Sequence, residues 1–237
     1  MDLDRPPGDL LNWTPRRPPS RTILPGARIR LEPLDPERHG DALFAAQGSG
    51  ADPELWTYMP SGPYDDETAF RQYLDESASS DDPLFFAIVD DASGIANGVA
   101  SFLRLDPAHG VIEIGHIWFG VALQRTPAAT EAIFLLARHA FDDLGYRRLE
   151  WKCDTLNARS RHAAERFGFQ YEGTFRQHRV VKGRNRDTAW YAIVDREWPA
   201  VRAAFEAWLD PTNFDRDGTQ QRSLGELREA LGSRTAG

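Results

Sequence analysis

The stretch that decides the fold runs from Ile112 to Phe167. Together with the two residues that follow it, the stretch reads IEIGHIWFG (112–120), VALQRTP (121–127), AATEAIFLLARHAFDDLGYRR (128–148), LEWKC (149–153) and DTLNARSRHAAERFGF (154–169). A strand pattern is followed by apolar residues at helical spacing, and a second strand pattern leads into a shorter helix. A strand, a long crossover helix and a second strand form a parallel pair. We expect the remaining segments to complete a sheet around this unit.

The turn before the long helix is its most informative part chemically. Thr126 is a good N-cap residue, and Pro127 suits the first helical position. The N–H groups at a helix start lack helical partners, and the helix dipole adds partial positive charge there. Such a turn can bind phosphate or pyrophosphate, and Arg125 adds a charge beside it. The apolar stripe that follows predicts a helix packed on the sheet: Ala129, Ile133, Leu136, Ala140 and Leu144.

These motifs resemble the acetyl-CoA site of the GNAT N-acetyltransferase superfamily, in the branch with the ribosomal-protein N-terminal acetyltransferases. That superfamily has a Gln/Arg-x-x-Gly-x-Gly/Ala turn, and here Gln124, Pro127 and Ala129 occupy the three places. Pro127 departs from the expected glycine and has no N–H to give. Asn157-x-x-Ser160, followed by the Gly168-Phe169 ending, resembles the second motif of the branch. The resemblance covers about 28–198.

The resemblance implies the GNAT fold, in which the two parallel strands splay and the acyl-pantetheine lies in the gap. It implies acetyl-CoA as co-substrate, with no metal, and transfer of an acetyl group by direct attack of a primary amine. That amine belongs to a small molecule or to a protein N-terminus. The cofactor-binding residues implied are Phe119, Val121, Gln124, Arg125, Thr126, Ala128, Ala129, Thr130, Asn157 and Ser160. The alternatives are a noncatalytic acyl-CoA-binding or interaction protein and, more remotely, nucleotide binding at the same helix start.

Three residues are candidates for the chemistry. Glu113 and His116 lie on the strand before the turn, and either could take the amine proton, directly or through water. Strand alternation puts them on opposite faces unless a bulge intervenes. The match of Glu113-Ile114-Gly115 to the branch favours Glu113. Ser160 is the implied proton donor to the leaving sulfur, and its alternative is a helix-start residue with local hydrogen bonds. Asn157 could cap the helix, bind pantetheine amides, or both.

The late hairpin is strongly basic. Its strands are expected at 171–181 and 188–194, joined by residues 182–187. The basic residues are Arg176, His178, Arg179, Lys182, Arg184 and Arg186. They indicate either a solvated hairpin or a site for an acidic substrate or for the 3′-phosphate of CoA.

The rest of the chain predicts a mixed α/β fold, with a mostly antiparallel sheet of about seven strands and flanking helices. Further strands are expected at 27–33, 84–89 and 95–105, and further helices at 35–46, 65–74, 197–209 and 223–231. The domain organisation expected is an extended arm (1–26), held by a partner or loosely ordered, a GNAT domain (27–198) and a C-terminal helical extension (199–237). Within that extension and just before it, apolar residues predict packing on the sheet edge or on a second subunit, which would be a homodimer: Trp198, Val201, Phe205 and Trp208.

Composition narrows the functional class. The chain has 237 residues, a formal net charge of −8 and one cysteine, Cys153. The acidic balance argues against nonspecific nucleic-acid binding, and a single cysteine excludes an internal disulfide. No Cys/His/carboxylate spacing indicates a metal, and no apolar stretch is long enough to span a bilayer. We expect a cytoplasmic protein with neither nucleic acid nor membrane as partner.

Overall fold

A computed structural model describes residues 10–48 and 54–232. Its elements are β1 (Leu24–Pro25), β2 (Ile29–Pro33), α1 (Pro36–Gly48), α2 (Glu67–Ser79), β3 (Leu84–Asp90), β4 (Ala96–Asp106), β5 (Val111–Phe119), α3 (Pro127–Arg138), a π-helical turn (His139–Asp143), β6 (Arg148–Asp154), α4 (Ala158–Phe167), β7 (Gln170–Val181), β8 (Arg184–Val194), α5 (Trp198–Leu209), a 3₁₀ turn (Pro211–Asn213) and α6 (Leu224–Gly232). The strands form one eight-stranded sheet in the order β1-β2-β3-β4-β5-β6-β8-β7. The predicted mixed, mostly antiparallel α/β architecture is confirmed.

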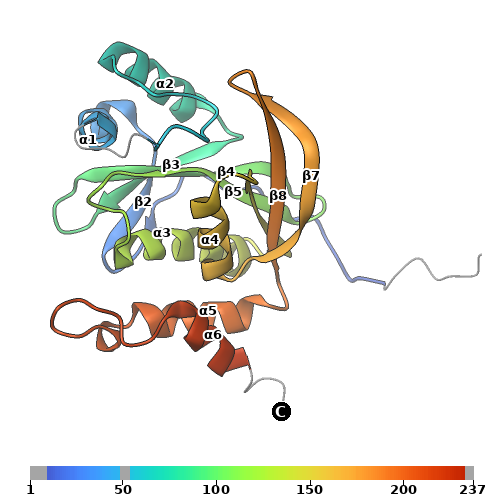
Figure 1. Ribbon diagram of the computed structural model, residues 1–237. Helices are drawn as coiled ribbons and strands as arrows, with labels where there is room; N and C mark the ends of the chain where they lie inside the picture. Colours follow the sequence, from blue (N-terminus) through green and yellow to red (C-terminus); the bar gives the residue numbers. More distant parts are fainter. Residues whose placement is uncertain (1–9, 49–53, 233–237) are drawn as a thin grey trace, which may run out of the picture.

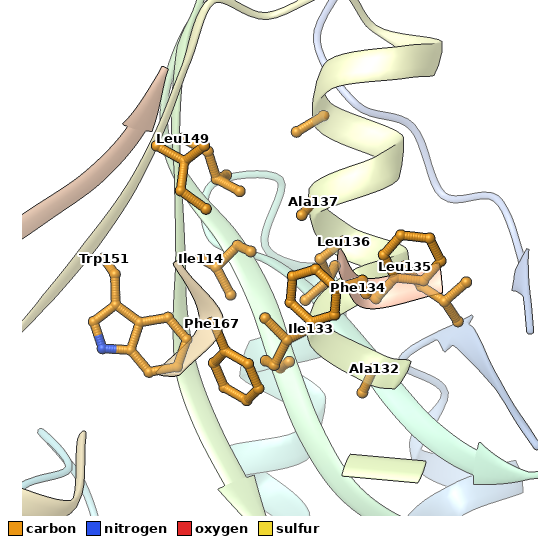
Figure 2. Close-up of a cluster of buried hydrophobic side chains, with 14 of the residues drawn as sticks. Ile114, Ala132, Ile133, Phe134, Leu135, Leu136, Ala137, Leu149, Trp151 and Phe167 are labelled. Carbon is orange, nitrogen blue, oxygen red and sulfur yellow. The ribbon is translucent and has the colours of Figure 1, made fainter. Parts of the chain in front are cut away.

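The sheet separates two groups of helices (Figure 1). Helices α1 and α2 lie over one face, where an apolar cluster includes Phe70, Val99 and Trp118. Helices α3 and α4 cover the other face, and α5 and α6 form a further layer beyond them. Figure 2 shows Ile133 of α3 lying toward Ile114 of β5 in the larger cluster. We call the two sides the α1/α2 face and the α3/α4 face.

The centre of the sheet opens between β5 and β6, its one parallel pair among the described strands. Their pairing runs from Val111–Arg148 to Glu113–Glu150 and ends there. Strand β5 nevertheless continues to Phe119 and β6 to Asp154. The two strands therefore part beyond Glu113, which leaves a gap in the middle of the sheet.

A β-bulge in β5 lies beside this gap. On β4, Ser101 pairs with Gly115 and Val99 pairs with Trp118, so β5 has one residue more than β4 over this interval. His116 takes the unusual φ of +48°. Because an extra residue reverses the alternation of side chains beyond it, Glu113 and Trp118 both face α1 and α2. His116 also lies on that face, in contact with Phe85 of the α1/α2 cluster.

Three boundaries differ from the sequence-based expectation. The eighth strand is β1, only two residues long, within the expected arm. The central helix does not stay α-helical to Leu144: α3 ends at Arg138, and a π-helical turn covers residues 139–143. The hairpin turn is Lys182-Gly183 alone, with φ of +49° and +72°, so β8 begins at Arg184 rather than at residue 188.

The C-terminal extension packs on α3 rather than on an edge of the sheet, so that expectation was wrong. The ring of Phe205 in α5 stacks on Phe134 of α3 at 5.4 Å, and Trp198 stacks on Phe141 at 5.0 Å. Phe205 is 1% exposed within the chain itself. The apolar face of α5 is thus covered without a second subunit.

The described part of the N-terminal arm lies against the domain. The indole N–H of Trp13 donates to the carbonyl of Ala108 at 2.8 Å. Its ring packs so closely on Gly110 that an added Cβ there would meet it at 2.3 Å. The rest of the expected arm, residues 1–9, falls outside the described residues. Among those described, no helix has the length and hydropathy needed to cross a membrane.

Candidate active site

The turn at the start of α3 is built around Thr126. Its hydroxyl donates to the carbonyl of Leu123 at 2.7 Å and accepts from the N–H of Ala129 at 3.2 Å, the N-cap geometry expected from the sequence. Gln124 supports the turn from the strand side, because its amide donates to the carbonyl of Phe119 at 2.8 Å. Both predicted residues therefore shape the turn through their side chains.

The turn leaves two backbone amides available to a ligand. The N–H groups of Gln124, Thr126 and Thr130 already donate to backbone carbonyls, and that of Ala129 donates to Thr126. Pro127 has none. The amides of Arg125 and Ala128 have no protein partner in the described structure. Arg125 is exposed and has a φ of +60°, so its guanidinium lies at the surface beside a helix N-terminus. This arrangement suits a pyrophosphate.

The other residues that the resemblance assigns to the cofactor site differ in how far they are exposed to solvent. Val121 is 53% exposed, and Phe119 and Ala128 are half-buried. Ala129 and Thr130 are buried, and the Thr130 hydroxyl accepts a hydrogen bond from Arg166 at 3.1 Å. These last two side chains therefore hold the helix in place.

Ser160 lies at the first turn of α4, next to the open end of β6. Asn157 caps the helix, because its side chain accepts from the N–H of Ser160 at 3.0 Å. The Ser160 hydroxyl accepts from the indole N–H of Trp151 at 3.0 Å. Burial raises the pKa of the neighbouring Cys153 thiol, and a hydrogen bond with Ser160 opposes that shift. The structure thus brings Asn157 and Ser160 together, with Trp151 and Cys153 on the α3/α4 face.

Glu113 lies across the sheet from that cluster, and it is 3% exposed. Its Oε2 contacts Lys152 Nζ at 2.9 Å and Arg104 Nη1 at 2.5 Å. Lys152 also contacts Glu150 at 2.5 Å and lies over the Trp190 ring at 3.9 Å. Ion pairs therefore hold the Glu113 carboxylate in one position, and no hydrogen-bond partner of its Oε1 is found among the described residues.

His116 is held by Ser101. The serine hydroxyl donates to the carbonyl of Gly115 at 3.1 Å and lies 3.0 Å from His116 Nδ1. Because the hydroxyl proton is used, Nδ1 is the donor to Ser101, and Nε2 carries the lone pair. Burial, and next the charges of Arg104 and Arg186, lower the pKa of His116 to about 4. The imidazole is therefore neutral at pH 7 and can accept a hydrogen bond.

The two groups of candidate residues flank the gap from opposite sides. Ser160 approaches with Trp151 from the α3/α4 face, whereas Glu113 and His116 face α1 and α2. A group threaded through the gap would have a hydroxyl on one side and two proton acceptors on the other. The bulge at His116 makes this possible, because it overrides the simple alternation that would separate the two acceptors.

The described part of the loop between α1 and α2, residues 54–66, contacts two other segments of the chain. The Tyr58 hydroxyl donates to the carbonyl of Leu156 at 3.0 Å, and Lys182 at the hairpin tip donates to the carbonyl of Trp56 at 2.7 Å. These contacts join the loop to the start of α4 and to the β7–β8 hairpin.

Sequence reasoning missed Lys152, Arg104 and Ser101. Lys152 had a detectable signal, since alternation in LEWKC places it opposite the apolar Trp151 and Cys153. The other two have no local signal, because their roles depend on the pairing of β4 with β5.

Comparisons of sequence and of fold show which known proteins this chain resembles. The family model described as acetyltransferase (GNAT) domain matches residues 28–170. A structure of a GCN5-related N-acetyltransferase from Brucella melitensis is 53% identical with a TM-score of 0.91, over 93% of this chain and 100% of that chain. A Bacillus subtilis protein named "Putative ribosomal N-acetyltransferase YdaF" is 28% identical over 71% of this chain and 90% of its own.

A more distant solved structure shares the fold. It is RimL, a ribosomal L7/L12 alpha-N-protein acetyltransferase, which is 21% identical with a TM-score of 0.63. The alignment covers 73% of this chain and 94% of RimL.

Proposed function

This chain belongs to the GNAT acetyltransferase family, and from that premise we propose that it transfers the acetyl group of acetyl-CoA directly to a primary amine in the gap between β5 and β6. The acceptor is the amine of a small molecule or of a protein N-terminus. The observation that carries this proposal is the gap itself, which is flanked by Ser160 on one face and by Glu113 and His116 on the other.

The turn at α3 is the proposed pyrophosphate site. Its free amides at Arg125 and Ala128 and the positive end of the helix favour an anion, and the exposed guanidinium of Arg125 adds to them. The absence of glycine at Pro127 removes one donor but keeps the helix start. Asn157 caps α4 with its side-chain oxygen, so its NH₂ group remains available for a pantetheine carbonyl.

In the proposed reaction the amine nitrogen attacks the thioester carbon, and the carbon–sulfur bond breaks. Glu113 accepts the amine proton through water, while the lone pair on His116 Nε2 receives an N–H of the amine and orients it. Ser160, which is held by the indole N–H of Trp151, donates its hydroxyl proton to the departing sulfur. It is then reprotonated from solvent, into which Glu113 releases the amine proton. The products are an acetylated amine and CoA.

An acetyl-transfer screen tests the proposal. The protein is incubated with acetyl-CoA and single amines, free thiol is measured, and the acetylated product is identified by mass spectrometry. Calorimetric titration with CoA, dephospho-CoA and pantetheine runs beside it. We expect CoA and dephospho-CoA to bind more tightly than pantetheine, since pantetheine lacks the pyrophosphate, and Arg125→Gln to reduce that difference. CoA binding without transfer to any amine would favour the noncatalytic alternative.

A further inference from the structure

The basic hairpin has two differently organised faces. Arg176 lies with Gln177, Asn185 and Asp187 around an open surface hollow. Hydrogen bonds from the Gln177 backbone and the Asn185 side chain lower the pKa of Asp187, and the charge of Arg176 adds to them. Arg186, one residue away from that set, alternates to the opposite side, the α1/α2 face. The charge of Arg186 acts there on Glu113, His116 and His178. The hairpin therefore directs one arginine toward the proposed acceptor side.

Arg186 has no salt-bridge partner in the part of the chain that the structure describes. Its Nε is buried and makes no hydrogen bond, and among the described residues it forms no ion pair. Two other partly buried strand arginines are both paired: Arg30 with Glu32 and Asp91, and Arg148 with Glu150 and Glu172. Burial accordingly lowers the pKa of Arg186, although the negative charge of Asp154 opposes this shift.

A second unused donor lies on the same face of β8. Trp190 is four residues from Arg186, and its Nε1 is also buried without a partner. Its ring contacts Phe175 at 4.5 Å and carries Lys152 Nζ at 3.9 Å. Buried donors are normally satisfied in folded proteins, so each of these two groups points to an acceptor that the protein itself does not supply.

The surrounding charge has the same sign. Burial lowers the pKa of His178, and four positive charges lower it further: Arg179, Arg104, Arg186 and Lys152. Arg179 is exposed and lies opposite Arg186 in the register of the hairpin. The two buried carboxylates nearby already form ion pairs: Glu113 with Arg104 and Lys152, and Glu150 with Lys152 and Arg148. Arg179 also forms no ion pair with any described residue. The acceptor side therefore has positive charge in excess.

We propose that the amine accepted by this enzyme carries a carboxylate, which Arg186 binds. This inference rests on the proposed function and names its substrate class. A guanidinium matches a carboxylate in geometry and charge. CoA is a less suitable occupant, because the turn that suits its pyrophosphate belongs to α3 on the other face of the sheet.

Paired acceptors test the proposal. Acetyl transfer to free amino acids is compared with transfer to their amides, and transfer to peptides with Glu in second place is compared with Gln versions. Acetyl transfer to phosphoethanolamine is compared with transfer to ethanolamine, which tests whether a phosphate replaces the carboxylate. Wild type should prefer carboxylates by about tenfold or more in kcat/KM, because removing the acceptor leaves buried donors unpaired. The amino-acid and peptide arms separate the two sources of the carboxylate.

Two variants locate the effect. Arg186→Gln should abolish the preference and leave the KM for acetyl-CoA unchanged. Arg176→Gln removes the same charge from the other face of the hairpin and should keep the preference. Three results would overturn the inference while the proposed function stood. Wild type could transfer acetyl groups with no preference for carboxylates, or it could prefer the phosphate-bearing amine. Alternatively, Arg186→Gln could weaken the binding of CoA and leave that of dephospho-CoA unchanged, which would assign Arg186 to the 3′-phosphate of CoA. Absence of both CoA binding and transfer would overturn both.

Discussion

The indole N–H of Trp151 donates to the Ser160 hydroxyl at 3.0 Å, so the serine oxygen is already an acceptor and its own proton is the one left to donate, to the Cys153 sulfur in the absence of a ligand. If that proton goes to the departing sulfur, Ser160→Ala should lower kcat by about 10²-fold. The KM for the amine should change much less, which is the pattern of a lost transition-state contact. Steady-state kinetics with saturating acetyl-CoA give both values.

Trp151→Phe is the matched variant for this pair, because it keeps an aromatic ring and removes only the donor. We expect a smaller fall in kcat, since Ser160 keeps its hydroxyl but loses the partner that orients it. Melting temperatures of both variants separate catalytic loss from unfolding. A fall below about threefold in Ser160→Ala would remove the serine from the mechanism.

Glu113 combines a proposed catalytic role with an ion-pair role. Glu113→Gln should lower kcat at neutral pH and leave CoA affinity nearly unchanged, because the pyrophosphate turn is on another element. It should also lower the melting temperature, since Lys152 is 4% exposed and would lose one of its two carboxylates. Unchanged kcat with a lowered melting temperature would leave Glu113 only its role in the ion-pair network.

His116 gives a pH-dependent contribution to stability. Its pKa in the folded protein is about 4, below the ordinary value of 6.5, so the unfolded chain binds more protons between these pH values. The contribution is present above about pH 6.5 and is lost as the pH falls to about 4. It amounts to at most about 3 kcal/mol, and partial exposure reduces it.

Replacing this histidine should therefore flatten the pH profile. His116→Asn should show less loss of melting temperature than wild type between pH 6.5 and 4. His109→Gln, on the exposed turn between β4 and β5, serves as the control and should follow wild type. Parallel wild-type and His116→Asn profiles would show that His116 does not stay neutral on folding.

The C-terminal extension should behave as part of the core. Phe205→Ala removes a ring that is 1% exposed and stacks on Phe134 and Phe167, and it should cost about 3–5 kcal/mol. Glu206→Ala, at an exposed position of the same helix paired with Arg202, should cost less than about 1 kcal/mol. Urea denaturation measures both. Equal stability of the two variants would mean that α5 is an appendage.

The elements themselves could be predicted where local pattern decides them. The Thr126-Pro127 helix start, the Asn157 cap and the succession of most strands and helices along the chain follow from short-range sequence signals. The bulge at His116 has no such signal, because it exists only in the pairing of β4 with β5. The place of Arg186 likewise depends on the true start of β8, which the polar residues 184–187 conceal. Long-range pairing thus decides which candidate residues share a face.

The position of the C-terminal helix shows the same limit. The apolar face of α5 was visible in the sequence, but its partner was not. An apolar stripe specifies that a surface must be buried and does not specify by what. Phe134 of α3 supplies that partner because α3 itself is apolar on both its sheet-facing and its outward-facing sides.

The central claim is direct acetyl transfer to an amine, and one measurement tests it most directly. The protein is mixed with isotopically labelled acetyl-CoA, first alone and then with an amine that bears a carboxylate, and mass spectrometry follows the label on protein and amine. The account predicts no labelled protein at any time and labelled acetyl-amine in a one-to-one ratio with released thiol. A labelled acetyl-protein intermediate that passes its label to the amine, or thiol release without labelled amine, would contradict it.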